Sequence, residues 1–146
     1  NSANFSVGKL LKIAVFILLS NKTLNSLADL VYVKNSEMKE SLNKCKDEHA
    51  ELGNRTHELL LSYKAETKEP HPVARAMSDM KIRGMLMMNN SEKTVADLMT
   101  DGCNMGVKSL SRYLNQYKNA TEESKNIARE IITSEQKLNE VLRYHL

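Results

Sequence analysis

The chain has 146 residues and a net charge of only +3, which allows one domain with a substantial core. Trp is absent and there are only two Pro and five Gly, which disfavours folds that need many tight β-turns. The positive excess lies in residues 1–34, which carry four Lys and one Asp, whereas the remainder carries 17 basic and 17 acidic residues. This balance excludes a basic nucleic-acid-binding surface, so we expect no nucleic-acid partner.

The first 34 residues contain a short, intensely apolar run over residues 10–19, next to Lys9 and Lys12. The run is shorter than the roughly 20 residues that span a membrane, and no small-residue cleavage site follows it. We therefore predict an apolar helix from about Ser6 to Val33, in a chain expected to be cytoplasmic. Because this helix is apolar around most of its circumference, the bundle or a second subunit must cover it. A membrane-surface anchor is the alternative.

The next segment, from about Ser36 to Glu66, shows a regular helical seam. Its apolar and small residues recur at alternating steps of four and three, namely Met38, Leu42, Cys45, His49, Leu52, Thr56, Leu59 and Tyr63. This spacing predicts a long amphipathic helix with one buried stripe. Ser36 is the expected N-cap, and Gly53 is expected to mark a close contact with a neighbour.

The firmest break in the chain is Glu69-Pro70-His71-Pro72, because two prolines forbid helix continuation. A shorter helix is predicted from Val73 to about Met88, followed by a cap at Ser91. A long helix is then expected from Glu92 to Lys118. Its predicted inward residues are Val95, Leu98, Met105, Leu110, Tyr113 and Tyr117, with Gly102 and Gly106 on the same side.

The last helix is predicted to begin after Thr121, which is a good N-cap, with Glu122 and Glu123 in its positively polarised first turn. Its seam is expected to contain Ile127, Ile131, Ser134, Leu138, Val141 and His145. The two cysteines, Cys45 and Cys103, each stand on an apolar stripe. We interpret them as reduced, buried thiols that pack as small hydrophobic side chains.

Residues 36–146 resemble the uncharacterised bacterial ferritin-like four-helix bundles. The resemblance is carried by the short helix that starts Val73-Ala74-Arg75-Ala76-Met77, the cap at Ser91, the stretch Leu98-Met99-Thr100-Asp101-Gly102-Cys103-Asn104-Met105-Gly106, the pair Tyr113-Leu114 and a last helix ending in Leu142-Arg143. It implies a ferritin-like bundle assembled as a dimer, and it implies no activity, because this family has none assigned. Residues 1–34 lie outside the resemblance.

A di-iron site in such a bundle requires a Glu-x-x-His pair on each of two helices. The residues three positions before the four histidines are Lys46, Asn54, Lys68 and Leu142, so the motif is missing and we expect no oxidase activity. The alternative is a degenerate metal site made of Glu48, His49, Asp101 and Cys103. Imidazole, thiolate and carboxylate ligands together suit zinc, and iron is the other candidate metal.

The sequence thus predicts an all-α, ferritin-like up-and-down bundle of four long helices and one short helix in a single domain, residues 1–146. No catalytic set is recognisable. We expect a non-enzymatic protein without a cofactor that acts through self-assembly, as a dimer, or through partner binding.

Overall fold

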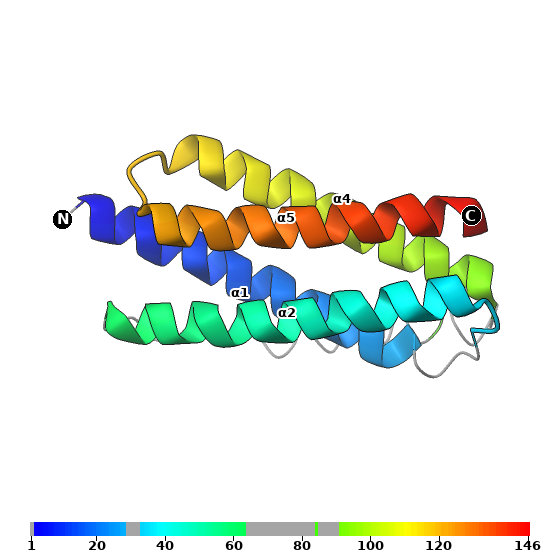
Figure 1. Ribbon diagram of the computed structural model, residues 1–146. Coiled ribbons are helices and arrows are strands. Elements are labelled where there is room, and N and C mark those ends of the chain that lie inside the picture. The colour runs from blue at the N-terminus through cyan, green and yellow to red at the C-terminus, as the bar shows by residue number, and fades with distance from the viewer. Residues whose placement is uncertain (1, 29–32, 64–83, 85–90) are drawn as a thin grey trace.

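The computed structural model describes residues 2–28, 33–63, 84 and 91–146 (Figure 1). The described elements are all helical, which confirms the predicted all-α bundle. They are α1 (Ser2–Ala28), α2 (Ser36–Ser62), α4 (Glu92–Gln116), α5 (Glu122–Leu142) and the short 3₁₀ turn η1 (Arg143–His145). Apart from Gly84, the predicted short helix Val73–Met88 lies outside the described residues, as does the break at residues 69–72.

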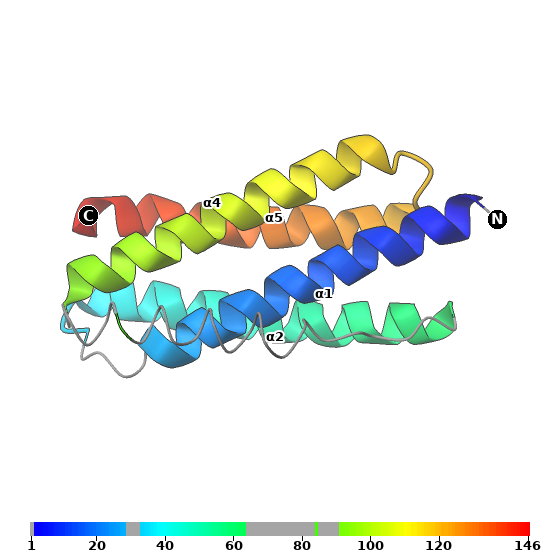
Figure 2. The same cartoon turned by 180° about the vertical axis from the view of Figure 1, so that it is seen from behind.

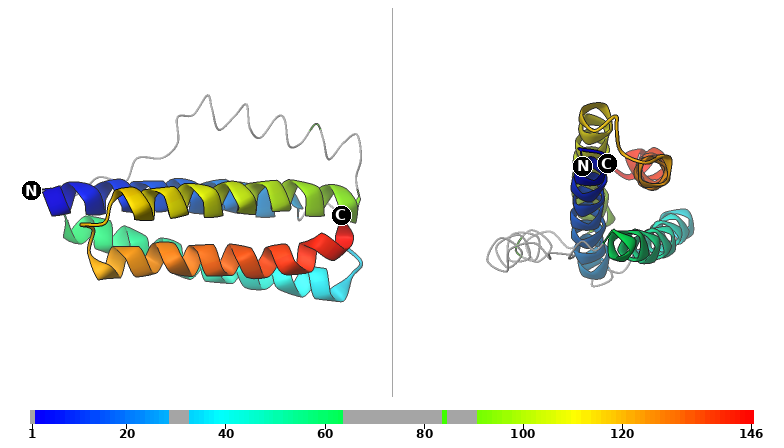
Figure 3. Two further views of the ribbon diagram at one scale, coloured as in Figure 1. Left: turned by 90° about the horizontal axis from the view of Figure 1, so that it is seen from above. Right: turned by 90° about the vertical axis from the view of Figure 1, so that its left-hand side faces the viewer.

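The four long helices form two layers, with α1 beside α4 in one layer and α2 beside α5 in the other (Figure 3). Each of α1 and α5 contacts the other three long helices, whereas no Cα atom of α2 lies within 8 Å of a Cα atom of α4. Neighbours around the bundle run antiparallel, so α2 and α4 run in the same direction (Figures 1 and 2). The helices therefore enclose one long core with α2 and α4 at opposite corners.

The first helix begins earlier than the sequence suggested, at Ser2 instead of Ser6, and its predicted end at Val33 is wrong. Val33 is not helical, because residues 33–35 lead into the cap of the next helix. That cap is Asn35, whose side chain accepts a hydrogen bond from the Met38 N–H at 2.9 Å. Ser36, the predicted N-cap, is instead the first residue of α2.

The seam predicted for α2 is confirmed. Its members from Met38 to Leu59 are all buried, and Tyr63 packs partly buried against the core. Gly53 makes no close contact, since a Cβ atom built there would meet nothing within 4 Å, so that expectation was wrong.

In α4 and α5 the predicted caps are confirmed, because the Ser91 and Thr121 side chains accept hydrogen bonds from the Thr94 and Ser124 N–H groups. The predicted stripe of α4 was partly wrong. Met105 is 66% exposed, and the buried positions are instead Thr94, Val95, Ala96, Met99, Cys103, Gly106 and Leu110. In α5 the predicted seam is buried from Ile127 to Leu138, and Val141 and His145 are half-buried.

The hydrophobic core divides into two clusters along the bundle. One cluster gathers α1, the second halves of α2 and α4 and the first half of α5, with members such as Leu10, Leu60, Leu110 and Ile131. The other gathers the first halves of α2 and α4 with the second half of α5, with members such as Met38, Met99 and Leu142. Within the described residues, no helix is long and apolar enough to cross a membrane.

Candidate functional site

A layer of buried side chains that carry polar or ionisable groups lies where the two hydrophobic clusters meet. We call it the polar layer, and it consists of His49 from α2, Ser134 and Glu135 from α5, and the two cysteines of the second cluster, Cys45 and Cys103. None of these residues is more than 5% exposed, and Glu135 is fully buried. A buried ionisable group is costly unless it is paired, so the contacts within this layer determine its chemistry.

Helix α2 positions His49 one turn after Cys45 on its buried seam. The His49 Nδ1–H group donates to the Cys45 carbonyl oxygen at 2.9 Å, and Nδ1 also lies 3.5 Å from Cys45 Sγ. The Ser134 hydroxyl completes this side of the ring, with Oγ 3.4 Å from His49 Nδ1 and donating to Cys45 Sγ at 3.6 Å. The Nδ1 edge of the imidazole therefore faces a sulfur, a carbonyl and a hydroxyl.

The opposite edge of the ring faces a carboxylate. His49 Nε2 lies 3.4 Å from Glu135 Oε1, which makes a buried ion pair across the α2–α5 interface. The sequence analysis missed Glu135. The signal was present, because Glu135 stands four positions after Ile131 and three before Leu138, and this spacing places it on the seam of α5.

Helix α4 makes room for this carboxylate at Gly106. A Cβ atom built at position 106 would lie 2.2 Å from Glu135 Oε2 and 2.9 Å from its carboxyl carbon. Only a residue without a side chain lets the Glu135 carboxylate occupy this place. Gly106 was expected on the inner side of its helix, and the structure shows what it accommodates.

The contacts of His49 change its pKa. Burial by itself lowers the pKa of His49. The hydrogen bonds to Cys45 and Glu135 and the electrostatic effects of both groups together outweigh burial, and the pKa rises to about 10. His49 is therefore an imidazolium at neutral pH, and both of its ring nitrogens carry protons. For Cys103, burial and then the electrostatic effects of the neighbouring Glu135 and Cys45 raise the pKa well above its ordinary value, which keeps this thiol protonated.

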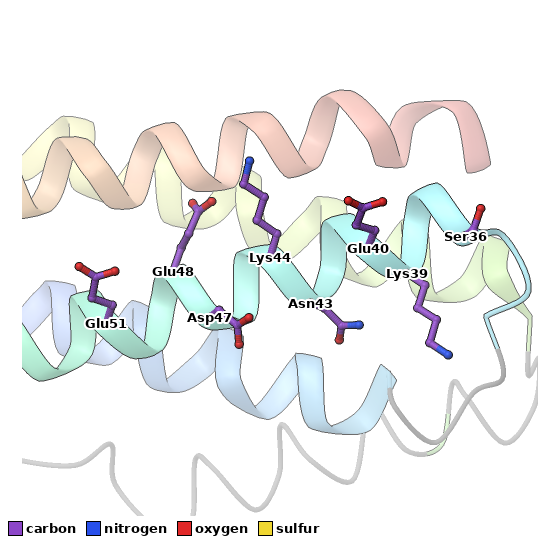
Figure 4. Close-up of a pocket in the computed structure, with 8 residues that line it drawn as sticks. All are labelled: Ser36, Lys39, Glu40, Asn43, Lys44, Asp47, Glu48 and Glu51. Carbon is purple, nitrogen blue, oxygen red and sulfur yellow. The ribbon is translucent and has the colours of Figure 1, made fainter.

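The four residues predicted as metal ligands are not gathered in one place. His49 and Cys103 belong to the polar layer, whereas Asp101 is exposed on α4. Glu48 is half-buried on α2 and lines a shallow surface hollow (Figure 4). Within the part of the chain that the structure describes, no group of three or more His, Cys, Asp and Glu side chains is arranged to hold a metal ion. The set Glu48, His49, Asp101 and Cys103 stays a prediction.

The two cysteines are free and buried, as the sequence predicted. They also belong to the two helices that do not meet, because no Cα pair between α2 and α4 is within 8 Å. A disulfide requires Cα atoms closer than about 7 Å, so Cys45 and Cys103 do not bridge without moving a helix.

A second shallow hollow lies over the α2–α5 interface. It is lined by charged residues of both helices and by Ser134, the hydroxyl that touches Cys45 Sγ and His49 Nδ1. The lining residues are Lys44, Glu48, Glu51, Leu52, Arg55, Asn126, Arg129, Glu130, Thr133, Ser134 and Lys137. This side of the bundle is thus the direction from which the polar layer lies nearest to solvent.

Comparison with known proteins adds no relative, since no family model, no curated protein and no solved structure matches this chain.

Proposed function

We propose that this protein is a non-catalytic bundle of the ferritin-like type, which acts by pairing with a second copy of itself through its first helix. The proposal rests on one observation, which is that Ile13 and Val15, beside the buried stripe of α1, are only partly buried.

Helix α1 differs from its neighbours in how its apolar residues are distributed. In α2, α4 and α5 they gather on one side, whereas in α1 they surround much of the helix. The buried stripe of α1 contains Leu10, Leu11, Ala14, Ile17 and Leu18. At 100° per residue, Ile13 and Val15 flank this stripe on its two sides, and both are only partly buried. A second copy would cover this remaining apolar surface.

The ferritin-like assignment is supported by the directions of the helices. Helices that are neighbours around the bundle are antiparallel. In contrast, α2 and α4, which are consecutive long helices along the chain, run in the same direction. A bundle of four long helices with one long crossover connection is the arrangement of ferritin-like folds.

The non-catalytic assignment is supported by the state of the polar layer. Its polar atoms contact one another, with His49 lying between Cys45 and Glu135. The residues that could act as nucleophile and base, Cys45 and His49, are 4% and 5% exposed. A substrate would have to displace packed helices to reach them, so the layer is better suited to holding the helices in place than to turnover.

The proposal is tested by measuring the molar mass of the protein in solution. Sedimentation equilibrium of the full chain is expected to give twice the 16.6 kDa of one chain. Charges at the flanks of the buried stripe should break the pair, because a lysine there would have to be buried between two copies. We therefore expect the variants Ile13→Lys and Val15→Lys to sediment as folded monomers.

Met105→Lys is the matched control, because Met105 is 66% exposed on α4 and does not flank the α1 stripe. It should leave the mass unchanged. A wild-type chain that sediments as a monomer over the whole concentration range would overturn the proposal. Flotation of the monomer with anionic lipid vesicles, lost in Val15→Lys, would assign α1 to a membrane surface instead.

A further inference from the structure

Cys45, His49 and Glu135 form a row in which a thiol, an imidazolium and a carboxylate follow one another. Cys45 Sγ is 3.5 Å from one ring nitrogen of His49, and Glu135 Oε1 is 3.4 Å from the other. The three groups come from only two helices, which pack directly on each other. This arrangement is independent of the self-association proposed above and concerns the thiol alone.

Cys45 Sγ lies 3.5 Å from a ring nitrogen of His49 and 3.6 Å from the Ser134 hydroxyl. The thiolate is the nucleophilic form of cysteine, and a neighbouring imidazolium stabilises it. Glu135 holds the imidazolium in place, and the Ser134 hydroxyl donates a hydrogen bond to the sulfur at 3.6 Å. The sulfur therefore accepts a hydrogen bond from Ser134 on α5 and lies beside the His49 ring on its own helix.

The sulfur is also close to a route from solvent. Ser134, in contact with Cys45 Sγ, is part of the lining of the hollow over the α2–α5 interface. Cys45 is therefore separated from this hollow by one small side chain. The proposal therefore concerns only a reactant small enough to meet the sulfur past the Ser134 side chain.

We propose that Cys45 is an oxidation-sensitive thiol that reacts with small peroxides to give a sulfenic acid. The thiolate sulfur attacks one oxygen of hydrogen peroxide, an S–O bond forms and the O–O bond breaks. The leaving hydroxide takes a proton from His49 and departs as water. The sulfur loses two electrons, the peroxide gains them, and the product is Cys45–SOH.

The fate of the sulfenic acid follows from the positions of the helices. Cys103, the other thiol, is on α4, and no Cα atom of that helix is within 8 Å of α2. An intramolecular disulfide is therefore not formed, and the sulfenic acid persists until an external thiol reduces it. Cys103 is also the internal control, because it is equally buried but has no imidazole beside it in the described contacts.

The test is to treat the folded chain with a small excess of hydrogen peroxide near neutral pH, to remove the peroxide with catalase, and then to unfold the chain in urea that contains dimedone, which traps sulfenic acids. Peptide mass spectrometry then compares labelling at Cys45 and Cys103. We expect Cys45 to be labelled about tenfold more than Cys103 when peroxide acts on the folded protein, and both equally when the chain is unfolded in urea before peroxide is added. Catalase added before the peroxide should abolish the label.

Two variants separate activation by His49 from mere accessibility. His49→Gln keeps the side-chain volume but removes the imidazolium, and Glu135→Gln removes the charge that holds it, so each should reduce Cys45 labelling toward the Cys103 level. Circular dichroism establishes that each variant is folded, and Cys103→Ser should leave Cys45 labelling unchanged. Equal labelling of the two cysteines in the folded wild type would overturn the proposal. Undiminished labelling of Cys45 in either folded variant would do the same.

Discussion

At the scale of single residues, the centre of the bundle depends on the contact between His49 and Glu135. Both side chains are buried, and their atoms come within 3.4 Å between helices α2 and α5. Breaking a buried pair by removing one partner leaves an uncompensated charge, which costs roughly 3–5 kcal/mol. The pair therefore stabilises the correct alignment of the two helices against alternatives that would separate the charges.

The pair makes stability depend on pH. The pKa of His49 is about 10 in the folded protein against 6.5 in the unfolded chain, so the folded state holds this proton more tightly. The resulting stabilisation is complete below pH 6.5 and is lost as the pH rises through about 10. Within this window the free energy of unfolding should fall by up to about 1.4 kcal/mol per pH unit.

Urea unfolding of the wild type and of His49→Gln at several pH values measures this effect. Lysines and tyrosines titrate at high pH in both proteins, so the difference between the two curves isolates His49. The expected difference is largest at pH 6 and shrinks toward pH 10. A difference that stays constant over this range would show that His49 does not titrate as described.

Gly106 provides a second prediction at the residue scale. Replacing it with Ala places a Cβ atom 2.2 Å from Glu135 Oε2, so the carboxylate must move away from its position beside His49. We expect Gly106→Ala to lower the free energy of unfolding by about 1–3 kcal/mol, as overpacking of a core does. Thermal or urea unfolding provides the measurement.

Gly53→Ala is the matched control for this substitution, because nothing lies within 4 Å of a Cβ atom at position 53 on α2. It should stabilise the protein by up to about 1 kcal/mol, since Ala is the better helix former. If Gly106→Ala were as stable as Gly53→Ala, the close approach of α4 to Glu135 would not be a constraint.

At the scale of helices, the caps determine where each element begins. The Asn35 side chain accepts a hydrogen bond from the Met38 N–H, and its own N–H donates to the Glu92 carboxylate at 2.9 Å. The Lys34 N–H also donates to Glu92. The first residue of α4 therefore anchors the chain just ahead of α2, at the end of the bundle where both helices start.

The cap gives a direct test of the helix boundary. Asn35→Ala should cost about 1 kcal/mol of stability, because it removes the acceptor for an otherwise unpaired N–H group. Ser36→Ala should change stability by less than about 0.5 kcal/mol, since Ser36 lies inside α2 and is exposed. Chemical denaturation of both variants distinguishes the two positions, and the opposite order would restore Ser36 as the cap.

Helix seams could be predicted from the sequence wherever apolar spacing was regular. The seam of α2 and the caps Ser91 and Thr121 were correct because they depend on local spacing and local hydrogen bonds. Met105 was misplaced because an apolar side chain was taken to be buried. The buried stripe from Thr94 to Leu110 includes the predicted Val95 and Leu110, but it also contains the small residues Ala96, Cys103 and Gly106.

At the scale of the whole molecule, the composition predicted the fold class, but local patterns could not predict which helices touch. The absence of contact between α2 and α4 depends on how all four long helices pack. The candidate site shows the same limit. His49 was identified from its position on a seam, whereas its partner Glu135 is 86 residues away and only the packing of α2 on α5 brings it there.

Helices α1 and α5, the first and the last of the described long helices, each contact all the other long helices. As the polypeptide emerges from the ribosome, the seams of α1, α2 and α4 are therefore translated before the helix that completes their enclosure. A nascent chain halted before residue 122 lacks both Ser134 and Glu135 and leaves His49 without its counter-ion. The interior is thus complete only once α5 has been synthesised, and products truncated before this helix should be prone to chaperone capture and degradation.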